Sequence, residues 1–122
     1  MSLAARHLEA NGIPTVIIGS AKDVVEYCGV PRFVFTDLPL GNPIGPPDHA
    51  DVQIAIVGLA LDMLSTATAP RTTWTAPVRW NPADDWRPRY ARVDASNIAR
   101  LHAMGEERRR QQSEAARLKR GE

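Results

Sequence analysis

Polar side chains directly follow two short apolar runs that are typical of buried strands. Ser20 comes after Thr15–Gly19, and Thr36 and Asp37 lie at the end of the run that begins at Arg32. In open parallel sheets, ligands bind beyond the carboxyl ends of the strands. The sequence therefore predicts that Ser20, Thr36 and Asp37 are polar contacts to a small substrate.

A stiff loop follows the second run and carries four prolines within residues 37–48. Proline fixes φ and removes an N–H donor, whereas glycine permits conformations that other residues resist. Asn42 offers an amide that can both donate and accept. The loop is interpreted as one wall of a pocket, and a rigid connector in which Asn42 only stabilises a turn is the alternative. The predicted substrate-binding residues are Ser20, Thr36, Asp37, Gly41, Asn42, Pro43 and Gly45.

Other reactive side chains give no catalytic arrangement. Cys28 is the single cysteine, and it lies at the end of a predicted helix, where the helix dipole opposes a thiolate. A structural role is favoured for it. The three histidines lack metal-binding spacing; they are His7, His49 and His102. No catalytic residue, metal site or cofactor is predicted.

The first 36 residues are predicted to alternate between helices and strands. A helix over Leu3–Glu9 precedes the strand Thr15–Gly19, and a helix that ends at Gly29 precedes the strand Arg32–Thr36. Two apolar strands joined by one helix form a parallel, right-handed βαβ unit. Ser20 is also a candidate N-cap for the connecting helix, and a capping role would explain a serine at this position without any contact to a ligand.

The next predicted helix, Val52–Leu64 with Asp48 as a candidate N-cap, has almost no polar face. A helix that is apolar all round is normally buried all round. Only two strands are predicted, and a two-stranded sheet does not stand alone. We therefore expect an oligomer, in which a second copy or another subunit completes the sheet.

Residues 70–90 have a different character. This stretch contains all three tryptophans and follows neither a helical nor a strand period; they are Trp74, Trp80 and Trp86. It is interpreted as an extended arm that either packs on its own domain or wraps a partner, because tryptophan and arginine are favoured interface anchors.

A basic helix is predicted over Asn97–Lys119, capped by Asp94 or Ser96. From Asn97 onward there are seven Arg or Lys residues and four Glu, although the whole chain has a net charge of only +1. This excess is too small to indicate nucleic acid. The chain shows no signal peptide and no apolar stretch long enough to span a bilayer, so a cytoplasmic protein without membrane association is expected.

The overall prediction is an α/β protein. A small parallel βαβ-type half-domain with flanking helices occupies residues 1–69, an extended Trp/Pro-rich arm residues 70–94, and a basic C-terminal helix residues 95–122.

Three motifs in order carry a family resemblance: "LEANGIPTVII", "CGVPRFVFTDLPLGNPIG" and the apolar helix that follows. Over Leu3–Ala69 the chain resembles the C-terminal half of the selenoprotein B family, which comprises the glycine, sarcosine, betaine and D-proline reductases and their selenium-free relatives. The resemblance implies reductive cleavage of a small amine or related substrate by a cysteine or selenocysteine pair, with electrons from a thioredoxin-type system.

In that family the redox pair lies just before the helix that leads into "GIPTV", ahead of Leu3. The resemblance therefore implies a reductase subunit or fragment that forms part of the substrate pocket, with the redox pair supplied by a partner subunit or by upstream sequence. The alternative is a non-catalytic module that binds protein or RNA through the tryptophan arm and the basic helix.

Overall fold

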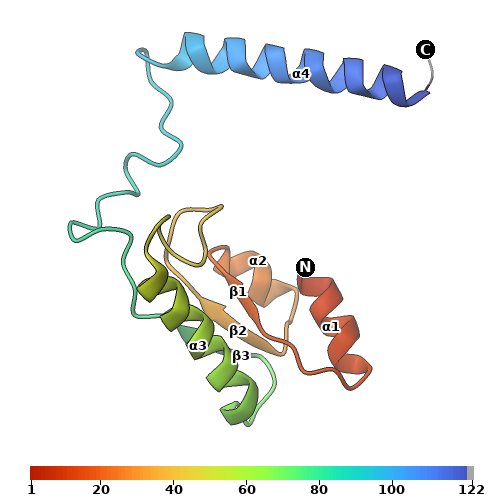
Figure 1. The fold of residues 1–122 in the computed structure, drawn as a ribbon, viewed down its shortest axis with the longest axis vertical. Coiled ribbons are helices and arrows are strands. Elements are labelled where there is room, and N and C mark those ends of the chain that lie inside the picture. Colours follow the sequence, from red (N-terminus) through yellow and green to blue (C-terminus); the bar gives the residue numbers. More distant parts are fainter. Residues whose placement is uncertain (121–122) are drawn as a thin grey trace. The chain divides into compact units, whose positions relative to one another are not determined.

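The computed structural model describes residues 1–120, which fall into two compact units (Figure 1). The first unit comprises residues 1–88, and the second begins at Arg89. The helices and strands of the first unit are α1 (Ser2–Ala10), β1 (Ile17–Gly19), α2 (Lys22–Tyr27), β2 (Arg32–Phe35), α3 (Ala50–Thr66) and β3 (Thr72–Thr75). The second unit contains α4 (Ile98–Arg120). The three-part division predicted from the sequence stays a prediction.

The sheet has three strands in the order β1-β2-β3, and both pairings are parallel. Ile17 pairs with Phe33 across β1 and β2, and Phe33 pairs with Thr73 across β2 and β3. The predicted α/β class with a parallel βαβ unit is therefore confirmed. The prediction of only two strands was wrong, because residues 72–75 complete the sheet from within the same chain.

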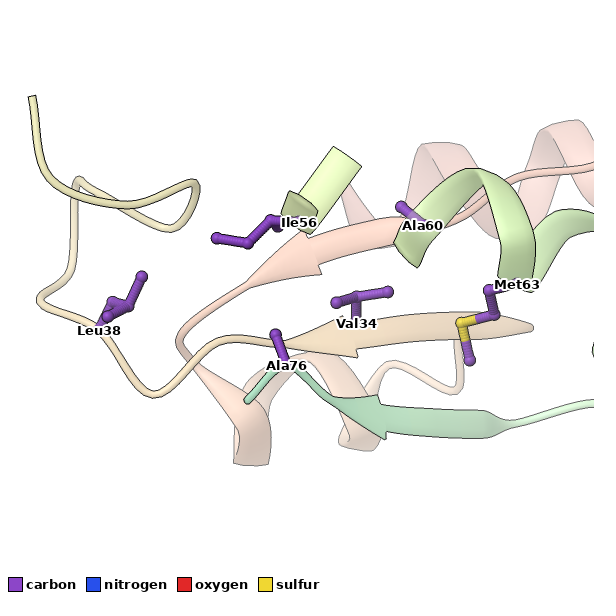
Figure 2. Close-up of a cluster of buried hydrophobic side chains, with 6 residues drawn as sticks. All are labelled: Val34, Leu38, Ile56, Ala60, Met63 and Ala76. Carbon is purple, nitrogen blue, oxygen red and sulfur yellow. The ribbon is translucent and has the colours of Figure 1, made fainter. Parts of the chain in front are cut away.

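Helix α3 covers one face of this sheet. Its side chains Ile56, Ala60 and Met63 are buried against Val34 of β2 (Figure 2). Leu38 and Ala76, which follow β2 and β3, complete this core cluster. On the other face Phe33 packs with Val25 of α2 and with Val30. Both faces of the parallel strands are thus covered, as buried parallel sheets require.

Two predicted helix caps were wrong. Helix α2 begins one residue later than expected, with Ala21 rather than Ser20 at the N-cap. Helix α3 has His49 at its N-cap, because Asp48 adopts a left-handed backbone with φ of 62°. An N-cap residue normally has an extended backbone that aims its side chain at the first free N–H groups. Neither helix has a side-chain hydrogen bond at its cap.

Part of the predicted tryptophan arm belongs to the first unit. Trp74 lies in β3, and both Trp74 and Trp80 pack against the core cluster beneath α3. An extended arm over residues 70–94 is therefore not confirmed. The short run Thr72–Thr75 is a strand because β-branched and aromatic residues suit a half-buried pleated surface.

Helix α4 agrees with the predicted C-terminal helix to within one residue at each end, and it contains no buried residue. The Asp94 carboxylate accepts hydrogen bonds from the hydroxyl and the backbone N–H of Ser96 just before the helix. These hydrogen bonds hold the pKa of Asp94 below its usual value. Within residues 1–120 no helix is both long enough and apolar enough to cross a lipid bilayer.

Candidate functional site

Two hydroxyl groups meet at the carboxyl ends of β1 and β2. The Ser20 Oγ and Thr36 Oγ1 atoms lie 3.4 Å apart. Parallel pairing of the two strands brings them together, and the Thr36 N–H donates to the carbonyl of Gly19 over 2.9 Å. Thr36 is completely buried, whereas Ser20 is partly accessible. Ser20 is therefore the member of the pair that a ligand could reach, and Thr36 supports it from beneath.

The proline-rich loop after β2 is a series of turns anchored at its start. Leu38 is buried in the core cluster, and the Asn42 N–H donates to the carbonyl of Pro39 over 3.0 Å. The Gly45 N–H then donates to the carbonyl of Asn42 over 3.2 Å. Gly45 has φ of 115°, and a Cβ added there would lie 3.0 Å from Cγ1 of Val52 in α3. Glycine thus permits the loop to approach α3 closely.

Asn42 contributes to this loop only through its backbone. Among the contacts of residues 1–120, its side-chain amide makes no hydrogen bond. Gly41, next to it, has φ of 96° and open space around its Cα. The half-buried Asn42 amide is therefore not engaged within the described residues, and whether it contacts a ligand or only stabilises a turn stays a prediction.

The Asp37 carboxylate is engaged by a residue that sequence reasoning missed. It pairs with Arg87, which also lies 3.4 Å from Asp84 and stacks 5.0 Å from the ring centre of Trp86. Both side chains of the Asp37–Arg87 pair are about half exposed. Asp37 is thus not an isolated negative charge, and a ligand at this edge would meet a guanidinium as well.

The structure brings together only part of the predicted set. Ser20 touches Thr36, but no hydrogen bond within residues 1–120 joins this pair to the loop residues Gly41–Gly45. A cavity of about 240 Å³ lies between α3 and the segment after β3. None of the seven predicted residues lines it; its walls are Ala55, Ile56, Leu59, Ala76, Pro77 and Val78.

The thiol and the metal-binding types of side chain form no cluster in the part of the chain that the structure describes. Cys28 is partly buried at the end of α2, and its carbonyl accepts a hydrogen bond from Arg6. No group of three or more His, Cys, Asp or Glu side chains within residues 1–120 could hold a metal ion. The described residues contain no thiol pair, so a dithiol step would need a second sulfur or selenium from elsewhere.

Comparison with known proteins gives one informative match. Over 62 residues the chain is 37% identical to D-proline reductase subunit gamma of Acetoanaerobium sticklandii. Part of this chain is related to a reductase subunit. The match covers 51% of this chain and 26% of the relative, so the chain spans about a quarter of that subunit's length. No family model matches, and no solved structure matches.

This match supports a distant relationship to the reductase family predicted from the sequence motifs. The relative is by name a subunit. The narrower assignment to the selenoprotein B proteins stays a prediction.

Proposed function

We propose that this chain is a subunit, or part of a subunit, of a reductase related to D-proline reductase. It forms part of the substrate pocket, and a cysteine or selenocysteine pair outside these 122 residues performs the redox step. The observation that carries the proposal is the 62-residue match to the gamma subunit of such an enzyme. The single cysteine supports the second part, because a dithiol reaction needs two sulfur or selenium atoms.

The proposed pocket wall is the carboxyl edge of the sheet. Ser20 supplies a hydroxyl there, Asn42 an unengaged amide, and the Asp37–Arg87 pair a carboxylate next to a guanidinium. Gly41, Pro43 and Gly45 give the wall its shape, and Thr36 holds Ser20 in place. Such a wall binds and orients a small polar substrate by hydrogen bonds and charge, without performing the chemistry.

Two experiments test this proposal at different levels. The nucleotide sequence just upstream of the codon for Met1 is expected to contain an in-frame UGA or a pair of cysteine codons within reductase-like sequence. Alternatively, copurification from the native organism is expected to yield a partner chain with such a pair. An upstream region from an unrelated gene, together with no reductase-like partner, would contradict the proposal.

The pocket wall is tested by Asn42→Ala in the assembled complex. Because the amide makes no hydrogen bond within the described chain, its loss should leave Tm nearly unchanged. Substrate affinity or activity should fall at least tenfold, about 1.4 kcal/mol. Asn11→Ala is the control: the Asn11 amide donates a hydrogen bond to the His7 carbonyl at the end of α1, so this variant should lower Tm and leave activity per folded molecule unchanged. If Asn42→Ala lowers Tm and leaves activity per folded molecule unchanged, the loop is a connector.

The interaction-module alternative keeps one supporting feature, the exposed basic helix α4. It loses most of the tryptophan arm, because Trp74 and Trp80 pack against the core of the first unit. We therefore favour the reductase subunit. A variant that ends at Pro88 and keeps full activity in the complex would show that α4 is dispensable for the reaction.

A further inference from the structure

A second group of charged side chains lies at the amino edge of the sheet, opposite the edge that carries Ser20 and Thr36. A cavity of about 490 Å³ opens there, between the start of β2 and the segment that joins α3 to β3. This volume lies within the range of small-molecule pockets. The charged residues that line it are Glu9, Arg32 and Arg71.

Arg71 is held over this cavity by unusual backbone geometry. It adopts a left-handed conformation with φ of 59°, which is costly for a residue with a side chain. Its guanidinium lies directly over Gly29, so a Cβ added to Gly29 would overlap Nη2 of Arg71. Gly29 is itself left-handed, with φ of 69°. Within residues 1–120 the Arg71 guanidinium donates no hydrogen bond and pairs with no carboxylate.

Arg32 and Glu9 neutralise each other in the wall. Nη1 of Arg32 lies 2.6 Å from the Glu9 carboxylate, and both side chains are mostly buried. Desolvation alone would raise the pKa of Glu9, but the hydrogen bonds from Arg32 and Thr15 outweigh it and hold this pKa below its usual value. Glu9 therefore stays ionised and bound to Arg32. Arg71 forms no ion pair within residues 1–120, although Glu26, which accepts a hydrogen bond from the Thr73 hydroxyl, lines a neighbouring cavity together with Arg71.

The rest of the cavity is largely apolar, because Pro31, Ala67, Ala69 and Pro70 line it. We propose that this cavity binds a small molecule with an oxyanion head, either a carboxylate or a phosphate, and an apolar body. The head pairs with the guanidinium of Arg71, whose planar fork suits two parallel hydrogen bonds to an oxyanion. The body rests on the proline and alanine walls. This site is independent of the proposed substrate pocket at the opposite edge.

The test is a titration of the full ¹⁵N-labelled chain followed by amide chemical shifts. Three probes are used: sodium benzoate, inorganic phosphate and benzamide, the neutral counterpart of benzoate. At least one of the two anions is expected to give saturable shifts at Gly29 and at residues 67–71. It should bind at least tenfold more tightly than benzamide. Tighter binding of benzoate than of phosphate indicates a carboxylate with an apolar body, and the reverse indicates a phosphate head.

Arg71→Met keeps the length of the side chain and removes its charge, and should weaken anion binding at least tenfold. Arg79→Met, an exposed arginine outside this cavity, is the control and should bind as the wild type does. The same spectra report whether each variant is folded. The proposal is overturned if neither anion saturates below about 10 mM, which corresponds to a binding free energy of roughly −3 kcal/mol. It is equally overturned if Arg71→Met and the wild type bind alike.

Discussion

The two faces of helix α3 carry the same kind of residue and have opposite surroundings. On the inner face Ile56, Ala60 and Met63 are 1%, 3% and 0% exposed. On the outer face Ile54 and Leu61 are 72% and 60% exposed. Hydrophobicity along the helix is therefore no guide to which side meets the sheet. The apolar outer face shows instead that α3 carries a second apolar surface, which is not buried in the core of the chain.

The outer face has the features of a contact surface. Ile54, Val57, Gly58 and Leu61 follow one helical stripe, and with Ile44 they line a groove of about 420 Å³. A contiguous exposed apolar surface usually marks an interaction site. This stripe is self-complementary, since a twofold axis between Val57 and Gly58 places Ile54 against Leu61 of a second copy. We therefore expect the isolated chain to associate with itself through this face.

The largest effect on stability is expected from a substitution on the inner face of α3. Ile56→Ala removes a completely buried side chain between α3 and β2, so the free energy of unfolding should fall by about 2–5 kcal/mol. In a chain kept monomeric by Leu61→Asp, Ile54→Ala on the outer face should change it by only about 0.5 kcal/mol or less. Urea titrations followed by tryptophan fluorescence measure both. Equal losses from the two substitutions would mean that the outer face is also packed in the folded chain.

The sequence predicted most helices and strands of the fold correctly, but it missed one strand. Helix α3 and the parallel pair β1–β2 follow from apolar runs and stop signals, and both are present. Strand β3 was missed because its four residues show no strand alternation and Pro77 follows soon after, a combination that is typical of a loop. Only its pairing with β2 makes it a strand. Pairing over a separation of about 40 residues leaves no local signal.

The candidate site shows the same limit. The meeting of Ser20 and Thr36 could be predicted, since parallel strands end at one edge of a sheet. The engagement of Asp37 by Arg87 could not, because these residues lie 50 positions apart and Arg87 is in an irregular segment. Nor does sequence periodicity indicate that Asn42 keeps its amide free, which depends on the path of the loop.

Association through the outer face is expected to be the next largest effect. At micromolar concentration the wild type should sediment as a dimer or larger species. Ile54→Asp combined with Leu61→Asp places charges in the stripe, so the association constant should fall at least tenfold, about 1.4 kcal/mol. Glu107→Ala in α4 is an exposed control and should not alter association. A monomeric wild type with a cooperative melt would contradict this prediction. It would also show that the outer face of α3 is stable in contact with water, without a second chain to cover it.

The smallest effect is expected from Gly58→Ala on the outer face of α3. This substitution should change the stability of the monomer and the strength of association in opposite directions. Gly58 lies in the middle of α3, and a Cβ added there has no atom within 4 Å. Gly58→Ala should therefore raise the stability of the monomer by about 0.5–1 kcal/mol, because alanine loses less backbone entropy in a helix. Urea titrations in the Ile54→Asp and Leu61→Asp background measure this gain without a contribution from association.

The same substitution in the otherwise wild-type chain should weaken association, because a methyl group at the centre of the stripe keeps the two helices apart. Gly105→Ala in α4 is the matched control: it also has open space around its Cα, and it should leave association unchanged. A Gly58→Ala chain that is more stable and associates as strongly as the wild type would place the contact elsewhere. The outer face of α3 would then be exposed without being the surface through which copies meet.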